Sequence, residues 1–526
     1  KNFETNKFLK KNNFLKLSFI VVFFSLILEF LIVDLPKQNL DFFHEGEWLT
    51  PGFHLLETND KLIDIFFIHG VFYDLVQSVI AWDLFNQISI GSVRYFNLIL
   101  IFITKIFLLI LIYKVSINQN LKNFKKFLIF LFLNLICLKL IRYDQSAYNY
   151  FTFRDIPLIL ILILSFDILR RNLTGIISSF AIGVISFSSL FFTIDRGIYS
   201  VFISGIILIL LLIQKKYLQS VLLFGGFVIS IIFLLIFLPI DQLKIFYENT
   251  LEILNIKPFL DNYKFPTPIF DRDTVSSKAI ITIIISIILT IKILVDKQKG
   301  NFLTKDTAFF IIILFVVNII VFKNALGRSD AAHIKYSLGF NYFLISFLAL
   351  YLILKNNILN RDNNFVYLIF GFLVIFLQIF YINKDTSKLS NLADYKTNTL
   401  RYINLEDTFF LNEEKRVFLK EYSKLLNTQD CEINLTNEPA WAYLLRKETC
   451  LKYYVSWFAA SDKLQENFIQ IIKEKKIDVI LFESKFQLLP DGLDNKNRIS
   501  KIINYLEKNY KILDYGNFKI AKLKDK

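Results

Sequence analysis

The chain has 526 residues, of which 54% are hydrophobic and 16% aromatic, and its mean hydropathy is +0.48. A composition this apolar excludes an ordinary soluble protein and indicates a mainly α, polytopic membrane protein. The net charge of +14 does not indicate nucleic-acid binding, because the Lys and Arg residues mostly flank apolar segments, where positive charge sets membrane orientation.

The first apolar segment, residues 17–33, follows the basic stretch KNFETNKFLKKNNFLK. This arrangement is similar to a signal peptide, but a small-residue cleavage site is missing and the segment continues into acidic sequence. We therefore expect a retained first helix.

Residues 34–93 form a long loop after this helix. Its beginning, DFFHEGEWLTPG, contains His44, Glu45, Glu47 and Trp48. Farther along, LIDIFFIHGVFYDLVQSVIAW has apolar residues at helical spacing, interrupted by Asp64, His69 and Asp74. This pattern predicts an amphipathic helix along the membrane surface that forms part of a pocket wall.

A membrane-spanning helix needs about 20 mostly apolar residues. Eleven segments approach that length: 17–33, 95–113, 127–141, 156–169, 174–193, 198–213, 218–240, 279–295, 308–322, 337–354 and 365–382. When these helices alternate in direction, the basic clusters between them all fall on one side. The positive-inside rule makes that side the cytoplasm.

The opposite side then receives the long first loop, all four histidines and several polar segments. One segment near residue 150 contains Asp144, Tyr148, Arg154 and Asp155, and IDRG follows near residue 195. Another, NALGRSDAAHIKYS, contains Arg328, His333 and Lys335. Charges at helix ends reach water or pair with each other, so a structural role is the alternative for Asp144, Arg154 and Asp155.

The composition changes from about residue 383 to mixed charged and apolar sequence. The pattern predicts a transmembrane domain over residues 1–382 and an α/β domain over residues 383–526, on the extracytoplasmic side. Cys431 and Cys450 both lie in this second domain. The sequence leaves open whether they form a disulfide or two free thiols.

Two glutamates in the first loop are the catalytic candidates. A carboxylate just outside the bilayer acts as a general base or holds a divalent cation against a phosphate, and Gly46 allows Glu45 and Glu47 to do either. We place His44 beside them and favour Glu45 slightly. The structural alternative is a solvated loop with Trp48 as an interface anchor.

Basic residues are the candidates for phosphate binding. Arg328 makes bidentate contacts to phosphate, and His333 and Lys335 add donors. The alternative for Arg328 is an ion pair with Asp330. Trp48 and Tyr148 are candidates for stacking on a sugar, and Asp144, Arg154 and Asp155 for further substrate contacts. There is no P-loop, GxGxxG after a strand, CxxC pair or HExxH sequence.

The chain resembles the GT-C superfamily of membrane glycosyltransferases, in a bacterial form whose acceptor is undefined. The resemblance lies in the amino-terminal helix, the acidic HEGE sequence of the long first loop, about eleven spans and a carboxy-terminal extracytoplasmic domain. It implies transfer of a sugar from a polyprenyl-phosphate or polyprenyl-diphosphate donor to a glycan, lipid or protein acceptor. It also implies that Glu45 or Glu47 occupies the position of the family's acidic catalytic residue.

This sequence departs from two branches of that superfamily. The first loop has neither Asp-Xaa-Asp nor adjacent Asp-Glu, and the second domain lacks a WWDYG-type signature. A protein O-mannosyltransferase, an oligosaccharyltransferase and an obligatory metal are therefore not expected, and a divalent cation stays a candidate cofactor.

Two other functions are alternatives. The spacing from Arg328 to Gly339 matches a loose Arg-x10-Gly pattern of lipid-linked O-antigen polymerases and ligases. A transporter or flippase would need polar residues at the bilayer midplane, where only Glu29 and Lys105 stand out.

Overall fold

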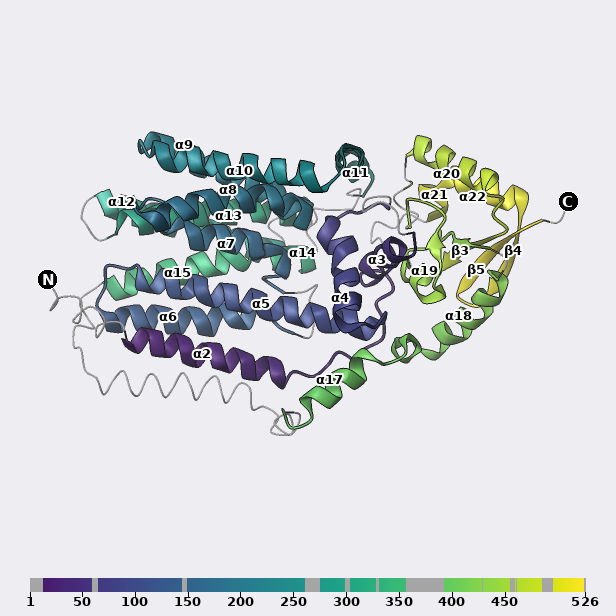
Figure 1. The fold of residues 1–526 in the computed structure, drawn as a ribbon, viewed down its shortest axis with the longest axis horizontal. Coiled ribbons are helices and arrows are strands. Elements are labelled where there is room, and N and C mark those ends of the chain that lie inside the picture. The colour runs from purple at the N-terminus through teal and green to yellow at the C-terminus, as the bar shows by residue number, and fades with distance from the viewer. Residues whose placement is uncertain are drawn as a thin grey trace.

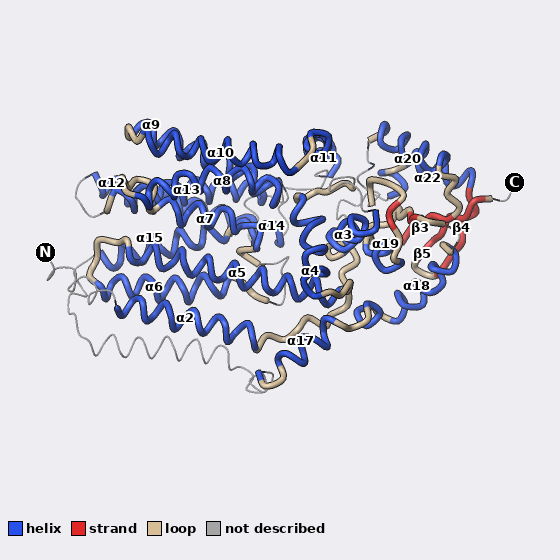
Figure 2. The backbone as a smooth tube through the Cα atoms, in the orientation of Figure 1, coloured by secondary structure: helices blue, strands red, loops and turns tan. Residues whose placement is uncertain are grey.

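The computed structural model describes residues 13–58, 65–143, 149–260, 275–298, 303–327, 331–355, 392–427, 429–454, 459, 461–484 and 495–524. A bundle of long helices occupies one side of the molecule, and a smaller mixed region with the strands occupies the other (Figures 1 and 2). The expected mainly helical class is confirmed.

The predicted spans correspond to a series of helices in the bundle. They are α2 (Asn13–Leu31), α5 (Ile90–Ile117), α6 (Asn123–Cys137), α7 (Ile156–Ser165), α8 (Leu173–Phe192), α9 (Ile194–Ile213), α10 (Tyr217–Phe237), α12 (Val275–Gln298), α13 (Lys305–Gly327) and α15 (Gly339–Lys355). Seven of the described helices are long and apolar enough to cross a membrane, and α15 is slightly shorter. The chain is therefore a multi-pass membrane protein. The count of eleven spans is not confirmed, and segment 365–382 lies outside the described residues.

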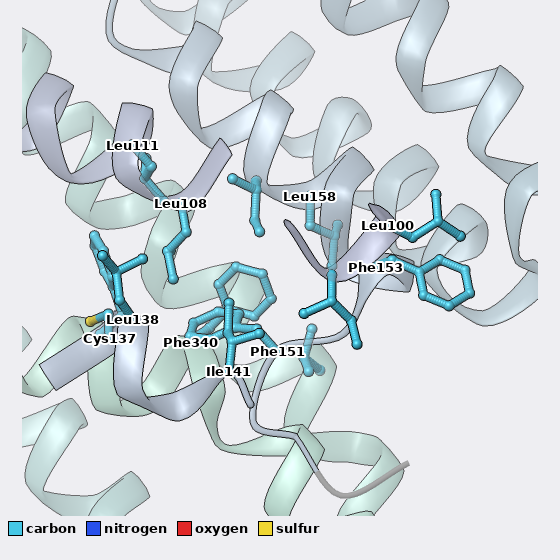
Figure 3. Packing of buried hydrophobic residues seen from close by; sticks show 14 of the residues in the cluster. Leu100, Leu108, Leu111, Cys137, Leu138, Ile141, Phe151, Phe153, Leu158 and Phe340 are labelled. Atoms are coloured by element: carbon cyan, nitrogen blue, oxygen red, sulfur yellow. The ribbon is translucent and has the colours of Figure 1, made fainter. Parts of the chain in front are cut away.

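Apolar side chains from α5, α6, α7 and α15 fill the bundle. Leu108, Leu158 and Phe340 from these helices are at most 1% exposed and pack with Cys137 and Phe151 (Figure 3). Water is absent from a bilayer interior, so packing of this kind and polar contacts between helices hold such bundles together.

Small and polar residues let neighbouring helices approach closely. A Cβ atom on Gly183 of α8 would overlap the backbone of α10, and one on Gly226 of α10 would overlap α8. Asn318 of α13 donates to Oδ1 of Asn341 on α15 and to Oγ of Ser286 on α12, both at 3.2 Å. These contacts hold α8 against α10 and connect α13 with α12 and α15.

Glu29 and Lys105, the two charged residues noted inside spans, form an ion pair between α2 and α5. The Lys105 Nζ lies 2.7 Å from Oε1 of Glu29 and 4.1 Å from the ring centroid of Tyr143. Pairing reduces the cost of placing charge at this depth.

The first loop contains α3 (Gly46–Thr58), the π-helical turn η1 (Val71–Val76) and α4 (Gln77–Phe85). The prediction of one amphipathic helix over LIDIFFIHGVFYDLVQSVIAW is wrong in its extent. Gly70 has φ of +145°, a conformation that side-chain-bearing residues rarely adopt, so the chain turns there and the helix begins only at Val71. Asp64 lies outside the described residues.

Between the bundle and the strands lie the helices of the first loop, α11 (Ile240–Leu260) and the short α14 (Ala331–Ser337) (Figure 1). Two short 3₁₀ turns, η2 (Leu138–Leu140) and η4 (Phe153–Asp155), precede α7. This layer contains most of the polar side chains discussed below.

The C-terminal region, residues 392–524, contains α17 (Tyr395–Ile403), η7 (Asp407–Phe410), α18 (Glu413–Leu425), β1 (Cys431–Glu432), α19 (Ala440–Leu445), β2 (Glu448–Thr449), α20 (Asp462–Glu474), β3 (Val479–Ser484), α21 (Asn495–Arg498), α22 (Ser500–Asn509), β4 (Tyr510–Tyr515) and β5 (Phe518–Leu523). Strands β1 and β2 pair in parallel, and β3, β5 and β4 form an antiparallel sheet in that order. Cys431 and Cys450 form a disulfide.

Candidate active site

Glu45 forms an ion pair with Arg94 of α5. Arg94 donates from Nε to Oε1 at 2.6 Å and from Nη2 to Oε2 at 2.7 Å, and the backbone N–H of Asp41 donates to Oε2 at 2.8 Å. The two side chains are only 5% (Arg94) and 14% (Glu45) exposed. Both oxygens of Glu45 are therefore engaged in attaching the loop to α5.

Glu47 lies in the first turn of α3 and is 5% exposed. Burial raises the pKa of this carboxyl from its ordinary value to about 7, although the charges of His69 and His44 lower it. A base whose pKa is close to the working pH is both deprotonated and strong enough to accept a proton. Of the two predicted glutamates, Glu47 has the environment of a general base.

His69 and Asp74 form a dyad next to Glu47. Asp74 is fully buried and accepts hydrogen bonds from the backbone N–H groups of Ile68 and His69, each at 2.7 Å, and its other oxygen lies 3.0 Å from Nδ1 of His69. Burial opposes the charged form of His69, but the Asp74 carboxylate outweighs it and raises the pKa of the imidazole. Asp74 thus fixes the ring and favours its protonated form.

The turn at Gly70 brings this dyad to the beginning of α9. The carbonyl of His69 accepts a hydrogen bond from the N–H of Ile194 at 2.6 Å. A Cβ atom on Gly70 would lie 2.7 Å from Cα of Thr193. Glycine is required here both by φ and by the close approach of two backbones.

The charged residues near 154 and 195 form ion pairs that join the two segments. Nη2 of Arg154 lies 2.7 Å from Oδ1 of Asp195, and Nε of Arg196 lies 2.6 Å from Oδ1 of Asp155. Arg196 also reaches Oδ2 of Asp195 at 3.3 Å. Two cations and two carboxylates therefore connect η4 with α9, and the structural role weighed for Arg154 and Asp155 is present.

Arg154 lies close to an aromatic group beside Glu47. Its guanidinium carbon is 5.3 Å from the ring centroid of Tyr73, which stacks on Phe153 at 5.3 Å and meets Trp48 edge-on at 5.7 Å. Nε of Arg154 is buried and has no hydrogen-bond partner among the described residues. A buried N–H without a partner is costly, so an oxygen ligand would be favoured there.

Four other predicted residues are described by the structure: His44, Trp48, His333 and Lys335. His44 pairs with Asp41 at 2.7 Å and is 47% exposed. His333 of α14 packs on Tyr336, and the Nζ of Lys335 lies 5.4 Å from the ring centroid of Tyr150. Trp48 is only 6% exposed, which leaves little ring surface for a sugar. Arg328, Asp144 and Tyr148 lie outside the described residues.

Sequence reasoning did not select Arg94, His69, Tyr73 or Asp74 for the site. The available signal was the interruption of an apolar helical pattern by His69 and Asp74, because a buried charged residue needs a partner. Within the described ranges, no group of three His, Cys, Asp or Glu side chains is arranged to hold a metal ion.

The C-terminal region contacts the first loop directly. Oγ1 of Thr50 donates to the carbonyl of Pro439 at 2.6 Å, and the N–H of Ala440 donates to the carbonyl of Phe42 at 3.2 Å. The hydroxyl of Tyr454 donates to the backbone carbonyl of Glu47 at 3.4 Å. The segment that carries the candidate base is thus held by Arg94 of α5 through Glu45 and by the C-terminal region.

A pocket of about 440 Å³ lies between α11 and α20. Tyr453, the neighbour of Tyr454, forms part of its wall and donates a hydrogen bond to Glu252 of α11. Lys452 also pairs with Glu252 at 3.3 Å. The lining residues are Glu252, Leu451, Lys452, Tyr453, Ser461, Lys463, Leu464, Asn467, Phe468 and Ile471.

The fold and the site together define a multi-pass helical membrane protein with a buried carboxylate at the end of its bundle that meets a mixed C-terminal region. No protein-family model matches the chain, and no curated protein matches it either. Among solved structures, the chain is similar to ArnT from Cupriavidus metallidurans bound to undecaprenyl phosphate. The identity is 9%, the match covers 95% of this chain and 97% of ArnT, and the TM-score is 0.48.

Two further structures are similar to the chain over the same 95% of its length. For the apo form of ArnT, the identity is 11%, the match covers 97% of the ArnT chain, and the TM-score is 0.48. For the Archaeoglobus fulgidus oligosaccharyltransferase tethered to an acceptor peptide, the identity is 11%, the match covers 74% of the oligosaccharyltransferase chain, and the TM-score is 0.43.

Proposed function

We propose that this protein is a GT-C-type glycosyltransferase that moves a hexosyl or pentosyl group from a polyprenyl-phosphate or polyprenyl-diphosphate donor to a glycan, lipid or protein acceptor. The observation that carries the proposal is the buried Glu47, whose pKa is raised to about 7 beside the His69–Asp74 dyad. A lipid donor is consistent with a chain that lacks a nucleotide-binding motif and has many apolar helices.

Glu47 is the proposed general base. An acceptor hydroxyl loses its proton to the carboxylate while its oxygen bonds to the anomeric carbon of the sugar. The bond from that carbon to the phosphate oxygen breaks at the same time, and the electron pair leaves with the lipid phosphate. Attack opposite the leaving group inverts the anomeric centre. Protonated His69, oriented by Asp74, stabilises the ionised form of Glu47 before the transfer.

Arg154 is the proposed principal contact to the lipid phosphate, because its buried Nε has no partner among the described residues. Charge builds on the phosphate oxygen in the transition state, and a preorganised donor is most effective there. Lys335 and His333 of α14, together with Arg328, remain the proposed additional donors. A divalent cation remains a candidate ligand of the donor phosphate.

The pocket between α11 and α20 is the proposed acceptor site. It combines two lysines, an amide and a tyrosine with apolar side chains, which suits a polar group with an apolar face. Its wall residue Tyr453 is adjacent to Tyr454, which contacts the backbone of Glu47. Asp144 and Tyr148 remain proposed contacts around the sugar, whereas the burial of Trp48 and Asp155 favours their structural alternatives.

The proposed location is the bacterial inner membrane, with a domain boundary near residue 383 and the C-terminal domain in the periplasm. The disulfide between Cys431 and Cys450 supports this orientation, because disulfides persist in oxidising compartments. A reporter enzyme fused after Lys526 should be located in the periplasm. Reporter activity in the cytoplasm would contradict the orientation.

The two alternative functions receive less support. Gly339 packs against the carbonyl of Tyr150, which accounts for this glycine without an Arg-x10-Gly motif. Glu29 and Lys105 neutralise each other, so the span interiors offer no unpaired charge there for a transported ion.

The test compares cells that carry the wild-type protein or Glu47→Gln and measures the surface glycan at equal protein level. Glu57→Gln is the matched control, because Glu57 lies on the same helix, α3, and is exposed. We expect loss of the glycan with Glu47→Gln alone. Equal glycan in all three strains would contradict the proposed base.

A further inference from the structure

The first-loop helix that carries Glu47 begins at a residue that directly meets the C-terminal region. A Cβ atom built on Gly46 would lie 2.5 Å from the backbone N of Ala440 and 2.8 Å from Cγ of Pro439. Both distances are shorter than any ordinary carbon contact, so a larger residue would force the two segments apart. Gly46 is therefore glycine because a backbone packs against it, and Glu47 is the next residue.

Hydrogen bonds fix the segment on both sides of this close contact. The N–H of Ala440 donates to the carbonyl of Phe42, before Gly46, and Oγ1 of Thr50, after it, donates to the carbonyl of Pro439. Thr50 is only 1% exposed. The 439–440 segment thus follows the beginning of α3 from its preceding loop to its second turn.

The 439–440 segment is itself held by a buried ion pair. Nζ of Lys415 lies 2.5 Å from Oε2 of Glu438, and both side chains are at most 7% exposed. Trp441 donates from Nε1 to the same oxygen at 3.0 Å, and its ring centroid lies 4.7 Å from that of Phe42. Moving the segment would separate this buried ion pair and leave an uncompensated charge. The pair therefore restricts the motion of the 439–440 segment.

We propose that Pro439 and Ala440 are positioning residues that keep Glu47 buried and correctly oriented through their contact with Gly46. The C-terminal region would then position the catalytic base in addition to binding substrate. This inference rests on the proposed function for its catalytic consequence, but the burial of Glu47 by this contact is measured separately.

Two kinds of substitution loosen the contact. Gly46→Ala adds the Cβ that overlaps Ala440. Thr50→Val removes the hydroxyl that donates to Pro439 and keeps the shape of the side chain, whereas Thr50→Ser retains the hydroxyl. Gly205→Ala is the matched control, since a Cβ on Gly205 of α9 would meet nothing within 4 Å.

The first readout does not depend on activity and uses the full-length protein in detergent micelles. Buried Glu47 makes the folded protein lose stability as the pH rises toward 7, because the unfolded chain ionises at lower pH. We expect Gly46→Ala to weaken this dependence of the melting temperature on pH, as Glu47 becomes exposed. The titratable groups that face Glu47 are His44 and Asp41 before α3, His69, Tyr73 and Asp74 of the neighbouring turn, and Tyr454 of the C-terminal region.

The second readout is sugar transfer. We expect Gly46→Ala to lower kcat about tenfold with donor KM within about twofold, since a misplacement of about 1 Å costs up to 100-fold in rate. The acidic limb of the pH–rate profile should move to lower pH. Thr50→Val should show a smaller change in the same direction, and Thr50→Ser and Gly205→Ala should match the wild type.

A wild-type pH dependence of melting in Gly46→Ala and Thr50→Val would overturn the inference. If Gly46→Ala fails to accumulate, the comparison of Thr50→Val with Thr50→Ser decides by the same criterion. Activity in Glu47→Gln would instead contradict the proposed function, and the melting measurement would still decide whether the contact buries Glu47.

Discussion

Arg94 of α5 holds Glu45 through two parallel hydrogen bonds of 2.6 and 2.7 Å. Glu45→Gln would leave the guanidinium buried without its negative partner, which costs about 3 kcal/mol of folding stability. We expect a clearly lower melting temperature but little change in transfer per folded molecule. Exposed Glu57→Gln should change neither. A Glu45→Gln protein that melts like the wild type and is inactive would transfer the catalytic role to Glu45.

The raised pKa of Glu47 predicts a pH-dependent gain in stability on substitution. The folded protein binds this proton more tightly than the unfolded chain, because the pKa is about 7 in the fold and 4.5 without it. Stability therefore falls as the pH rises from about 4.5 to about 7, by roughly 3 kcal/mol in total. Glu47→Gln should remove this loss.

Thermal unfolding of the wild type and Glu47→Gln at several pH values checks the prediction. The two proteins should melt alike near pH 4, and the variant should be more stable at pH 8. Equal melting temperatures across the whole range would mean that Glu47 titrates normally and is unsuited to the proposed role.

The disulfide between Cys431 and Cys450 predicts a defined pattern of thiol labelling. The chain has three cysteines, and Cys137 is buried in the bundle as a free thiol. Without reduction, the denatured protein should react at one thiol, and after reduction at three. Cys431→Ser removes the bond and should lower the folding stability by about 3 kcal/mol, because the two cysteines close a loop with a sequence separation of 19. Three reactive thiols before reduction, in protein isolated from the native membrane, would contradict the oxidised pair and the periplasmic location.

The pair of Glu29 and Lys105 predicts compensation between two substitutions. Lys105→Gln leaves Glu29 without its partner inside a span, at a cost of about 3 kcal/mol. We expect less protein in the membrane for either single variant and recovery in Glu29→Gln/Lys105→Gln. The double variant should transfer sugar normally. Normal accumulation with loss of activity would instead indicate a functional role for this pair.

Within the described residues, the apolar segments of the sequence predict the long helices of the bundle, and the change in composition predicts the mixed α/β character of the C-terminal region. Apolar length alone predicts a span such as Ile90–Ile117, and mixed charged and apolar sequence predicts the α/β region that contains Val479–Ser484. These features depend on the local pattern of residues, so a single sequence is enough to predict them.

The assignment within the site required tertiary structure. Glu45 and Glu47 are two residues apart and equally acidic, and only the position of Arg94 and the packing of Ala440 make one a structural partner and the other a buried base. The pairing of Arg154 with Asp195, rather than with its neighbour Asp155, likewise depends on how η4 meets α9. The His69–Asp74 dyad depends on the turn at Gly70, which the helical periodicity of the segment conceals.

The most direct test of the central claim is the pH–rate profile of sugar transfer by wild-type and Glu47→Gln protein in isolated membranes. We predict that the wild-type rate rises about tenfold per pH unit below pH 7 and levels off above it, since only ionised Glu47 accepts the acceptor's proton. Glu47→Gln should be inactive at every pH. A Glu47→Gln protein with a wild-type rate and profile would contradict the account.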